Sequence, residues 1–153
     1  MAKQTSHTDP RDPLNLAACT CANLRRAMRA VTQAYDAALA PTGLRATQFT
    51  VLAALSLSGD VPLGRLAKAL GMDRTTLTRN LRPLSARGLV EDVREGDQRV
   101  RLVRLTASGR ALLEDARPLW ERVQERTVGG LGQTRWAGLL DDLDRLVGGG
   151  IRA

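Results

Sequence analysis

Three arginines and three threonines between positions 74 and 82 form the pattern with the clearest chemistry in this sequence. Leu77, Leu81 and Leu84 recur among them at steps of four and three, which predicts a helix with an apolar inner side. The polar residues then project outward, where an arginine can donate two hydrogen bonds to guanine and threonine hydroxyls suit phosphates or base edges. We therefore expect duplex DNA to contact Arg74, Thr75, Thr76, Thr78, Arg79 and Arg82, with Arg79 reading a base and Arg74 and Arg82 on phosphates.

The elements around this face predict a helix-turn-helix followed by a β-hairpin. Residues 63–70 predict a short helix, and Asp73 is a good N-cap for the helix that carries the arginines. Pro83 lies inside that helix, so we expect its last turn to bend and the base-reading part to precede it. Residues 89–93 and 100–105 predict two strands joined by a glycine-containing loop. This order is typical of a winged helix.

Amphipathic helices flank the predicted winged helix. Between residues 15 and 40 the apolar positions keep a heptad rhythm, and they are Ala17, Cys21, Leu24, Met28, Val31, Tyr35 and Ala38. Thr47 is expected to cap the next helix. Thr106 is expected to cap a long helix that breaks at Gly129 and Gly130, before a last helix. These stripes hold more apolar surface than one small core can bury, so we expect two chains to pair through them. A homodimer also suits a palindromic site on double-stranded DNA.

The predicted fold class is therefore mainly α (α+β), a winged helix-turn-helix core with flanking dimerisation helices. Residues 1–14 are expected to form a flexible arm and residues 149–153 a flexible tail. Residues 15–45 and 107–148 form the predicted dimerisation domain, and residues 46–106 the DNA-binding domain.

Charge supports a polyanionic partner. The chain of 153 residues carries a formal charge of +7, and residues 63–105 hold ten basic against five acidic residues, a net of +5.

The sequence contains no apolar run long enough for a membrane span and no apolar stretch typical of a secretory signal, so we expect a cytoplasmic location. The single histidine, His7, lies in the predicted arm, and no phosphate loop or metal-ligand spacing is present. We expect no enzyme activity, no cofactor and no metal.

The sequence resembles the MarR family of bacterial winged-helix regulators over nearly everything after residue 15. The segments that carry the resemblance are LAPTGLRATQFTVLAAL, LAKALGMDRTTLTRNLRPLSARGLVEDV and GDQRVRLVRLTASGRALL. It implies a homodimer whose first and last helices interlock, a recognition helix in the major groove, and repression relieved by a ligand or oxidant. One departure is the start of the third helix, where Leu63-Gly64-Arg65 replaces the family's usual Ser/Thr and acid, so that end is expected either to fray or to cap differently.

The wing is interpreted by the same resemblance. Asp97-Gln98-Arg99 looks like the family's Asp-x-Arg tip, which implies that Asp97 holds Arg99 for insertion into a narrow minor groove. Arg94 and Arg101 are expected to flank it on the DNA backbone.

Family analogy also implies a ligand pocket where the first and fifth helices meet the winged core. Its candidate residues, for a small anionic or aromatic ligand, are Arg25, Met28, Arg29, Val31, Tyr35, Phe49 and Leu52, although each apolar one is also explained as core. The ligand itself, the operator and the direction of regulation are not encoded in these patterns.

Two alternatives remain open from the sequence. Cys21 is either a buried small hydrophobe or, by resemblance to hydroperoxide-sensing members, a redox-active thiol in a thiol-based repressor, with Cys19 on another side of the helix. A winged helix can also be a protein-interaction module, for which binding would not fall steeply with salt.

Overall fold

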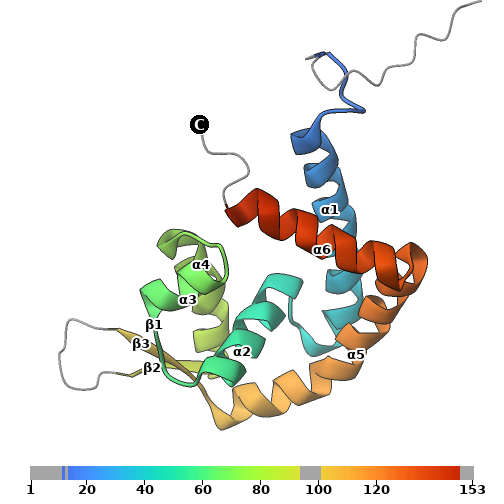
Figure 1. The fold of residues 1–153 in the computed structure, drawn as a ribbon. Helices are drawn as coiled ribbons and strands as arrows, with labels where there is room; N and C mark the ends of the chain where they lie inside the picture. The colour runs from blue at the N-terminus through green and yellow to red at the C-terminus, as the bar shows by residue number, and fades with distance from the viewer. Residues whose placement is uncertain (1–11, 13, 94–100, 149–153) are drawn as a thin grey trace, which may run out of the picture.

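A computed structural model describes residue 12 and residues 14–93 and 101–148. In chain order its elements are α1 (Thr20–Leu39), η1 (Ala40–Thr42), α2 (Ala46–Ser58), β1 (Val61–Pro62), α3 (Leu63–Ala69), α4 (Arg74–Ala86), β2 (Val90–Val93), β3 (Leu102–Leu105), α5 (Ala107–Leu131) and α6 (Gln133–Gly148). Figure 1 shows α1 and α6 at one end of the molecule and β2 and β3 at the other, with α5 running between them. The predicted mainly α class with a small sheet is confirmed.

The helix-turn-helix is formed by α3 and α4. Gly71 joins them with φ 61°, a left-handed conformation that glycine adopts without steric cost. Asp73 caps α4 as predicted, because its carboxylate accepts a hydrogen bond from the Thr76 N–H at 2.7 Å. Leu77 and Leu84 are fully buried, so the inner face of α4 is the predicted one. Pro83 lies within the helix.

The start of α3 confirms the expected departure in capping. Its N-cap is Pro62, which offers no side-chain acceptor, and the first N–H group, that of Leu63, donates instead to the carbonyl of Arg101 at 3.1 Å. The segment before β3 therefore replaces the usual capping side chain.

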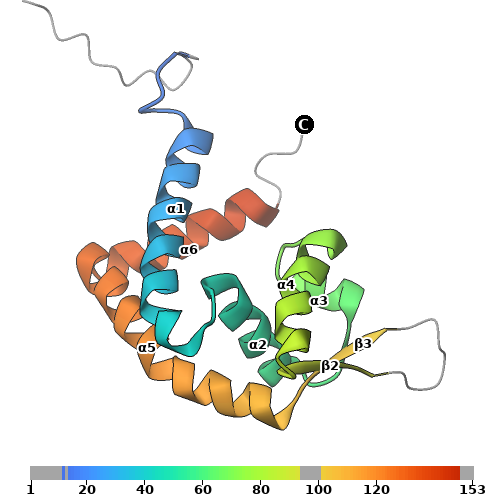
Figure 2. The ribbon, with the colours of Figure 1, turned by 180° about the vertical axis from the view of Figure 1, so that it is seen from behind.

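The sheet has three antiparallel strands in the order β1-β3-β2. Figure 2 shows two of them, β2 and β3, beside α4. The two predicted strands, β2 and β3, pair without interruption, from Val90 with Leu105 to Val93 with Leu102. The strand β1 was not predicted. It consists of two residues, Val61 and Pro62, which pair with β3 and are too short to show alternation.

Two predicted helix boundaries are wrong. Thr47 does not cap α2: the N-cap is Arg45, whose N–H donates to the side-chain oxygen of Gln48 at 3.0 Å, and Thr47 lies one position inside the helix. Gly129 and Gly130 do not break α5, which ends at Leu131 and has Gly132, with φ 82°, as its C-cap. A glycine only weakens a helix by about 1 kcal/mol, whereas a left-handed residue ends it. Thr106 caps α5 as predicted, accepting from the Gly109 N–H at 3.0 Å.

The core lies inside the winged head and beneath α5, whereas α1 and α6 leave apolar side chains exposed. Leu39, Leu52, Leu55, Leu66 and Val103 are among the fully buried residues. Large exposed apolar residues of α1, α5 and α6 include Leu24, Met28, Val31, Leu131, Leu139, Leu140 and Val147. None of the helices within the described ranges is long and apolar enough to cross a membrane.

Candidate nucleic-acid interface

The outer face of α4 presents the predicted polar residues together. Arg74, Thr75, Thr78, Arg79 and Arg82 line one open, shallow hollow. The leucines on the opposite side of the helix are buried, so the core holds α4 and leaves this surface to solvent. The structure thus brings together five of the six residues that the sequence singles out on this helix.

The sixth, Thr76, has a different task. Its hydroxyl donates to the Asp73 carboxylate at 2.7 Å, and its backbone N–H donates to the same group. These two bonds, the backbone one first, lower the pKa of Asp73, so the carboxylate stays charged. Thr76 therefore belongs to the N-terminal cap of α4, and of the three threonines only Thr75 has a hydroxyl with no partner among the described residues. The Thr78 hydroxyl donates to the Arg74 carbonyl at 2.8 Å.

The arginines of α4 and its C-cap divide into two groups by their partners. Arg74, Arg79 and Arg82 form no ion pair within the part of the chain that the structure describes. Arg87 instead donates to the carbonyls of Gly43 and Thr42 at 3.0 and 3.1 Å, and so ties the end of α4 to the linker before α2. The first group is available to an external anion, and Arg87 is structural.

Arg104 belongs to the structural group as well. Its guanidinium donates to both carboxylate oxygens of Asp60, through Nε at 2.7 Å and through Nη2, and Nη1 lies 4.0 Å from Glu91. The Arg104 hydrogen bond lowers the pKa of Asp60. Neither Arg87 nor Arg104 was among the predicted DNA contacts, but the charge count over residues 63–105 treats them like the DNA-facing arginines, because their partners are distant in the chain.

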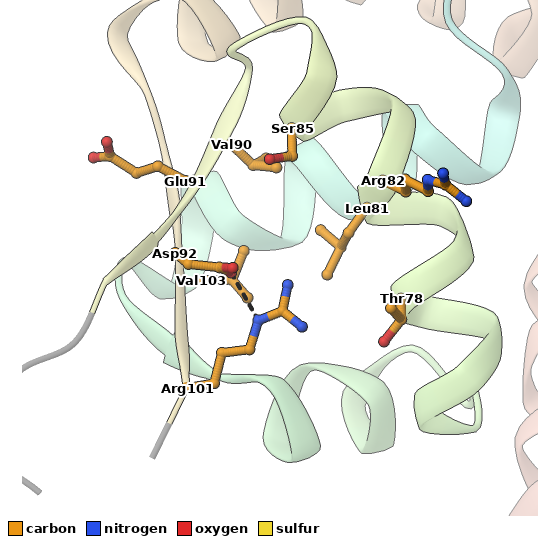
Figure 3. A pocket seen from close by; sticks show the side chains of 9 residues that line it. All are labelled: Thr78, Leu81, Arg82, Ser85, Val90, Glu91, Asp92, Arg101 and Val103. Carbon is orange, nitrogen blue, oxygen red and sulfur yellow. Dashed lines mark hydrogen bonds and ion pairs between the residues drawn. The ribbon is translucent and has the colours of Figure 1, made fainter. Parts of the chain in front are cut away.

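A second hollow of about 230 Å³ lies between α4 and the wing strands (Figure 3). Its walls include Thr78 and Arg82 from α4 and Asp92 and Arg101 from the hairpin, over a floor of Leu81, Val90 and Val103. Arg101 donates through Nε to Asp92 at 2.8 Å. Because Thr78 and Arg82 line both hollows, the predicted contact Arg101 faces the same surface as the outer side of α4. The other wing predictions, Arg94, Asp97 and Arg99, lie outside the described residues.

The predicted ligand-pocket residues divide between the core and the surface of the single chain. Tyr35, Phe49 and Leu52 are buried in the core, whereas Arg25, Met28, Arg29 and Val31 are exposed on α1. Phe49 and Trp120 stack with ring centroids 5.8 Å apart, and Tyr35 lies 6.0 Å from Trp120. The core explanation therefore holds for the three buried residues in the single chain.

A partly buried hydrogen bond and a small cavity lie where α5 packs against α1 and α2. The Tyr35 hydroxyl donates to the side-chain oxygen of Gln124, and burial raises the pKa of Tyr35. Phe49 also lines a cavity of about 190 Å³ with Leu57, Leu113 and Arg117, on the side of α2 that faces α5.

Cys21 is exposed and Cys19 is half-buried in the single chain. The interpretation of Cys21 as a buried small hydrophobe therefore does not hold in the single chain, where Leu24, Met28 and Val31 of the same stripe are also exposed and Tyr35 is buried. Within the described ranges no three His, Cys, Asp or Glu side chains are grouped so that they could hold a metal ion.

The helix-turn-helix, the hairpin and the arginine-bearing face of α4 together define a winged-helix DNA-binding protein. The model for the MarR family matches residues 42–99. The HTH-type transcriptional repressor NicR of Pseudomonas putida is 30% identical over 125 residues, which cover 81% of this chain and 79% of NicR. The chain belongs to the MarR family and is a DNA-binding transcriptional regulator.

Solved structures agree with this assignment. The M. tuberculosis transcriptional regulator MosR in complex with DNA is 44% identical with a TM-score of 0.77, and the match covers 84% of this chain and 92% of MosR. BpsR of Bordetella bronchiseptica, whose DNA binding is regulated by 6-hydroxynicotinic acid, is 31% identical with a TM-score of 0.75, over 85% of this chain and 95% of BpsR. These descriptions name DNA and a small organic acid, and they do not favour the thiol-based alternative at Cys21.

Proposed function

We propose that the protein is a homodimeric repressor that binds palindromic double-stranded DNA through α4 and the wing and is released by a small organic ligand. The observation that carries this proposal is the surface formed by Arg74, Arg79, Arg82 and Arg101, on which the first three arginines form no ion pair among the described residues. Unpaired guanidinium groups on an exposed, core-supported helix are suited to phosphates and guanine edges.

The contacts follow from position along α4. Thr75 and Arg79 lie one turn apart on the outer face, before Pro83, and are assigned to base edges. Arg74 and Arg82 border that face and are assigned to phosphates, together with Arg101 from the hairpin. By family resemblance, Arg99, supported by Asp97 and flanked by Arg94, enters the minor groove.

The dimer is supported by the apolar side chains that α1 and α6 leave in solvent. Met28 is 63% exposed, Val31 45% and Leu140 42%; in the single chain α1 buries only Tyr35 and Leu39, at its C-terminal end, and α6 buries no residue. A second copy of the chain can bury these apolar side chains, because it offers the same apolar surface. In this proposal residues 15–45 and 107–148 form the dimerisation domain, and residues 46–106 form the DNA-binding domain. Met28→Glu is expected to shift the protein from dimer to monomer in sedimentation equilibrium, while Arg29→Glu, the neighbouring position on the predicted polar side, leaves the dimer intact.

Ligand release is supported by the BpsR relationship, since 6-hydroxynicotinic acid is a small aromatic acid. The exposed Arg25 and Arg29 lie on α1 beside the proposed dimer face, where they are suited to pair an anionic ligand. Aromatic carboxylates, beginning with 6-hydroxynicotinic acid, are the probes of this proposal. One of them is expected to raise the Kd for DNA, and the Arg29→Ala substitution is expected to reduce that response.

We further propose that the protein is not an enzyme and that it acts in the cytoplasm, where the chromosome lies.

The test of DNA binding uses duplexes from the region upstream of the protein's own gene and a scrambled duplex of the same length, measured by fluorescence anisotropy. Arg79→Ala is expected to cost about 1–3 kcal/mol on the specific duplex and to relax selectivity at one base position. Arg122→Ala on α5 removes the same charge far from α4 and is the matched control. Binding must weaken steeply with salt. Salt-indifferent binding, or equal effects of the two substitutions, would refute the proposal and favour a protein-interaction module.

A further inference from the structure

The hollow between α4 and the wing lies where a DNA backbone must pass if the protein binds as proposed. A helix in the major groove and a hairpin in the adjacent minor groove are separated by one sugar–phosphate strand, because that strand forms the wall between the grooves. The hollow has this position, with Thr78 and Arg82 on its α4 side and Asp92 and Arg101 on its wing side. The inference that follows rests on the proposed function.

Arg101 reaches into this hollow with only part of its guanidinium occupied. Its Nε donates to Asp92 at 2.8 Å, and within the described residues neither terminal nitrogen has a hydrogen-bonding partner. Figure 3 shows the guanidinium extending across the hollow, with its terminal nitrogens on the side of Leu81 and Thr78. Arg104, three residues further on, is different, because its terminal nitrogens face Asp60 and Glu91. Arg101 thus keeps two amino groups for an anion, and Arg104 does not.

Asp92 is the unexpected member of this surface. A carboxylate beside a DNA backbone repels the phosphates, so on charge alone it weakens binding. The orientation of the Asp92 carboxylate toward Arg101, however, points to a role that strengthens DNA binding. Asp92 is paired with Val103 in the β2–β3 register, and Figure 3 shows its carboxylate turned toward Arg101. The neighbouring Glu91 also lines the hollow, but its carboxylate points to the opposite side, away from Arg101.

We propose that Asp92 is a positioning residue for DNA binding: it holds Arg101 through Nε so that the two terminal amino groups point at the phosphate strand between the grooves. A planar guanidinium fixed at Nε is oriented as well as placed, which reduces the rotamer entropy lost when the phosphate binds. The pair is about half exposed, with 46% of the Arg101 side chain and 49% of the Asp92 side chain accessible, so a bound strand can reach it.

The experiment compares two neighbouring carboxylates on β2 by anisotropy with the specific duplex. Asp92→Ala is expected to weaken binding by about two- to fivefold, the range that a half-exposed ion pair can supply. Glu91→Ala changes the net charge by the same amount and is expected to leave the affinity unchanged or to tighten it slightly. Asp92→Asn keeps an oxygen that accepts from Nε, so it is expected to restore most of the affinity that Asp92→Ala removes.

A double-mutant cycle with Arg101→Ala separates positioning from a general effect on the wing. Arg101→Ala alone is expected to weaken binding and to lower the salt slope by about 0.9 for each phosphate that is no longer neutralised. In the Arg101→Ala background, Asp92→Ala must no longer weaken binding, since the residue it orients is gone.

The inference is overturned if Asp92→Ala matches Glu91→Ala, or if it weakens binding equally with and without Arg101. A loss of affinity that accompanies a matching fall in Tm of Asp92→Ala also overturns it, because that result assigns Asp92 to folding. If the unaltered protein binds no duplex in a salt-dependent way, the proposed function itself fails. Salt-dependent binding with an inert Asp92 refutes only the positioning role.

Discussion

Gly109 in the first turn of α5 is the position where the structure leaves no room for a single added carbon. A Cβ there would lie 2.0 Å from the carbonyl oxygen of Leu89 and 2.7 Å from Leu105 Cδ1. Both distances are far inside the roughly 3.5 Å at which non-bonded heavy atoms meet. The Leu89 carbonyl cannot turn away freely, because it accepts the Thr106 N–H at 3.1 Å where the sheet meets α5.

The expected magnitude for Gly109→Ala follows from two opposing terms. Overfilling a packed core costs about 1–3 kcal/mol, and we take the upper end because the clash is with backbone. Alanine returns about 1 kcal/mol through its higher helix propensity. The net loss in the free energy of unfolding is about 2 kcal/mol, which corresponds to a Tm lower by about 4–8 °C for a chain of this length.

Gly129→Ala is the matched control, in the same helix and with the same chemical change. No atom lies within 4 Å of the Cβ that it adds, so only the propensity term remains and Tm should rise by about 2–4 °C. Thermal unfolding followed by circular dichroism, at one protein concentration because the proposed dimer makes Tm concentration-dependent, measures both. An unchanged or raised Tm for Gly109→Ala would show that the contact with Leu89 does not limit this position.

Three further predictions concern the described residues. Tyr35→Phe removes the bond to Gln124 and should cost about 1 kcal/mol of stability; because burial raises the pKa of this single tyrosine, a 295 nm absorbance titration of the unaltered protein should give a value above that of free tyrosine. Asp73→Ala should lower Tm by removing the cap of α4. Since hydrogen bonds lower the pKa of Asp73, its contribution is complete above about pH 4 and is lost as the pH falls through the native value, so the Tm difference should shrink in acid. Arg82→Ala should lower the salt slope of DNA binding by about 0.9 for each phosphate left without its arginine, whereas Arg87→Ala should lower Tm and leave the slope unchanged.

The parts of the fold that the sequence predicted are those set by local chemistry. Asp73 and Thr106 are caps in the structure because each accepts a backbone N–H three residues ahead, a geometry contained in a few residues. The leucine spacing in α4 likewise fixed which side is buried. The two boundary errors arose where local preference was outweighed: Gly129 and Gly130 continue a helix because neither needs a left-handed backbone, and Gly132 does.

The sequence predicted where the candidate DNA-binding surface lies, but not which of its side chains are already hydrogen-bonded within the chain. Six polar residues on α4 were singled out, and five share the outer surface. Thr76 is turned to Asp73 by a hydroxyl bond that competes with any contact to DNA, which residue type alone does not reveal. The ligand pocket stays a prediction, because in the single chain Tyr35, Phe49 and Leu52 are already buried in the core, as their apolar character also allowed.

The net positive charge of residues 63–105 does not by itself tell how many arginines can bind phosphates. The net of +5 over residues 63–105 counts every arginine equally, yet Arg87 and Arg104 use their donors on partners 44 or 45 residues away in the chain. A guanidinium already bonded to carbonyls or a carboxylate has few donors left for a phosphate, although its charge still adds to the long-range field. The formal charge therefore predicts attraction to DNA, whereas the number of phosphates bound depends on the arginines that the fold leaves available. For the described residues this distinction selects Arg74, Arg79 and Arg82, and it assigns Arg101 to both roles, held at one nitrogen and available at two.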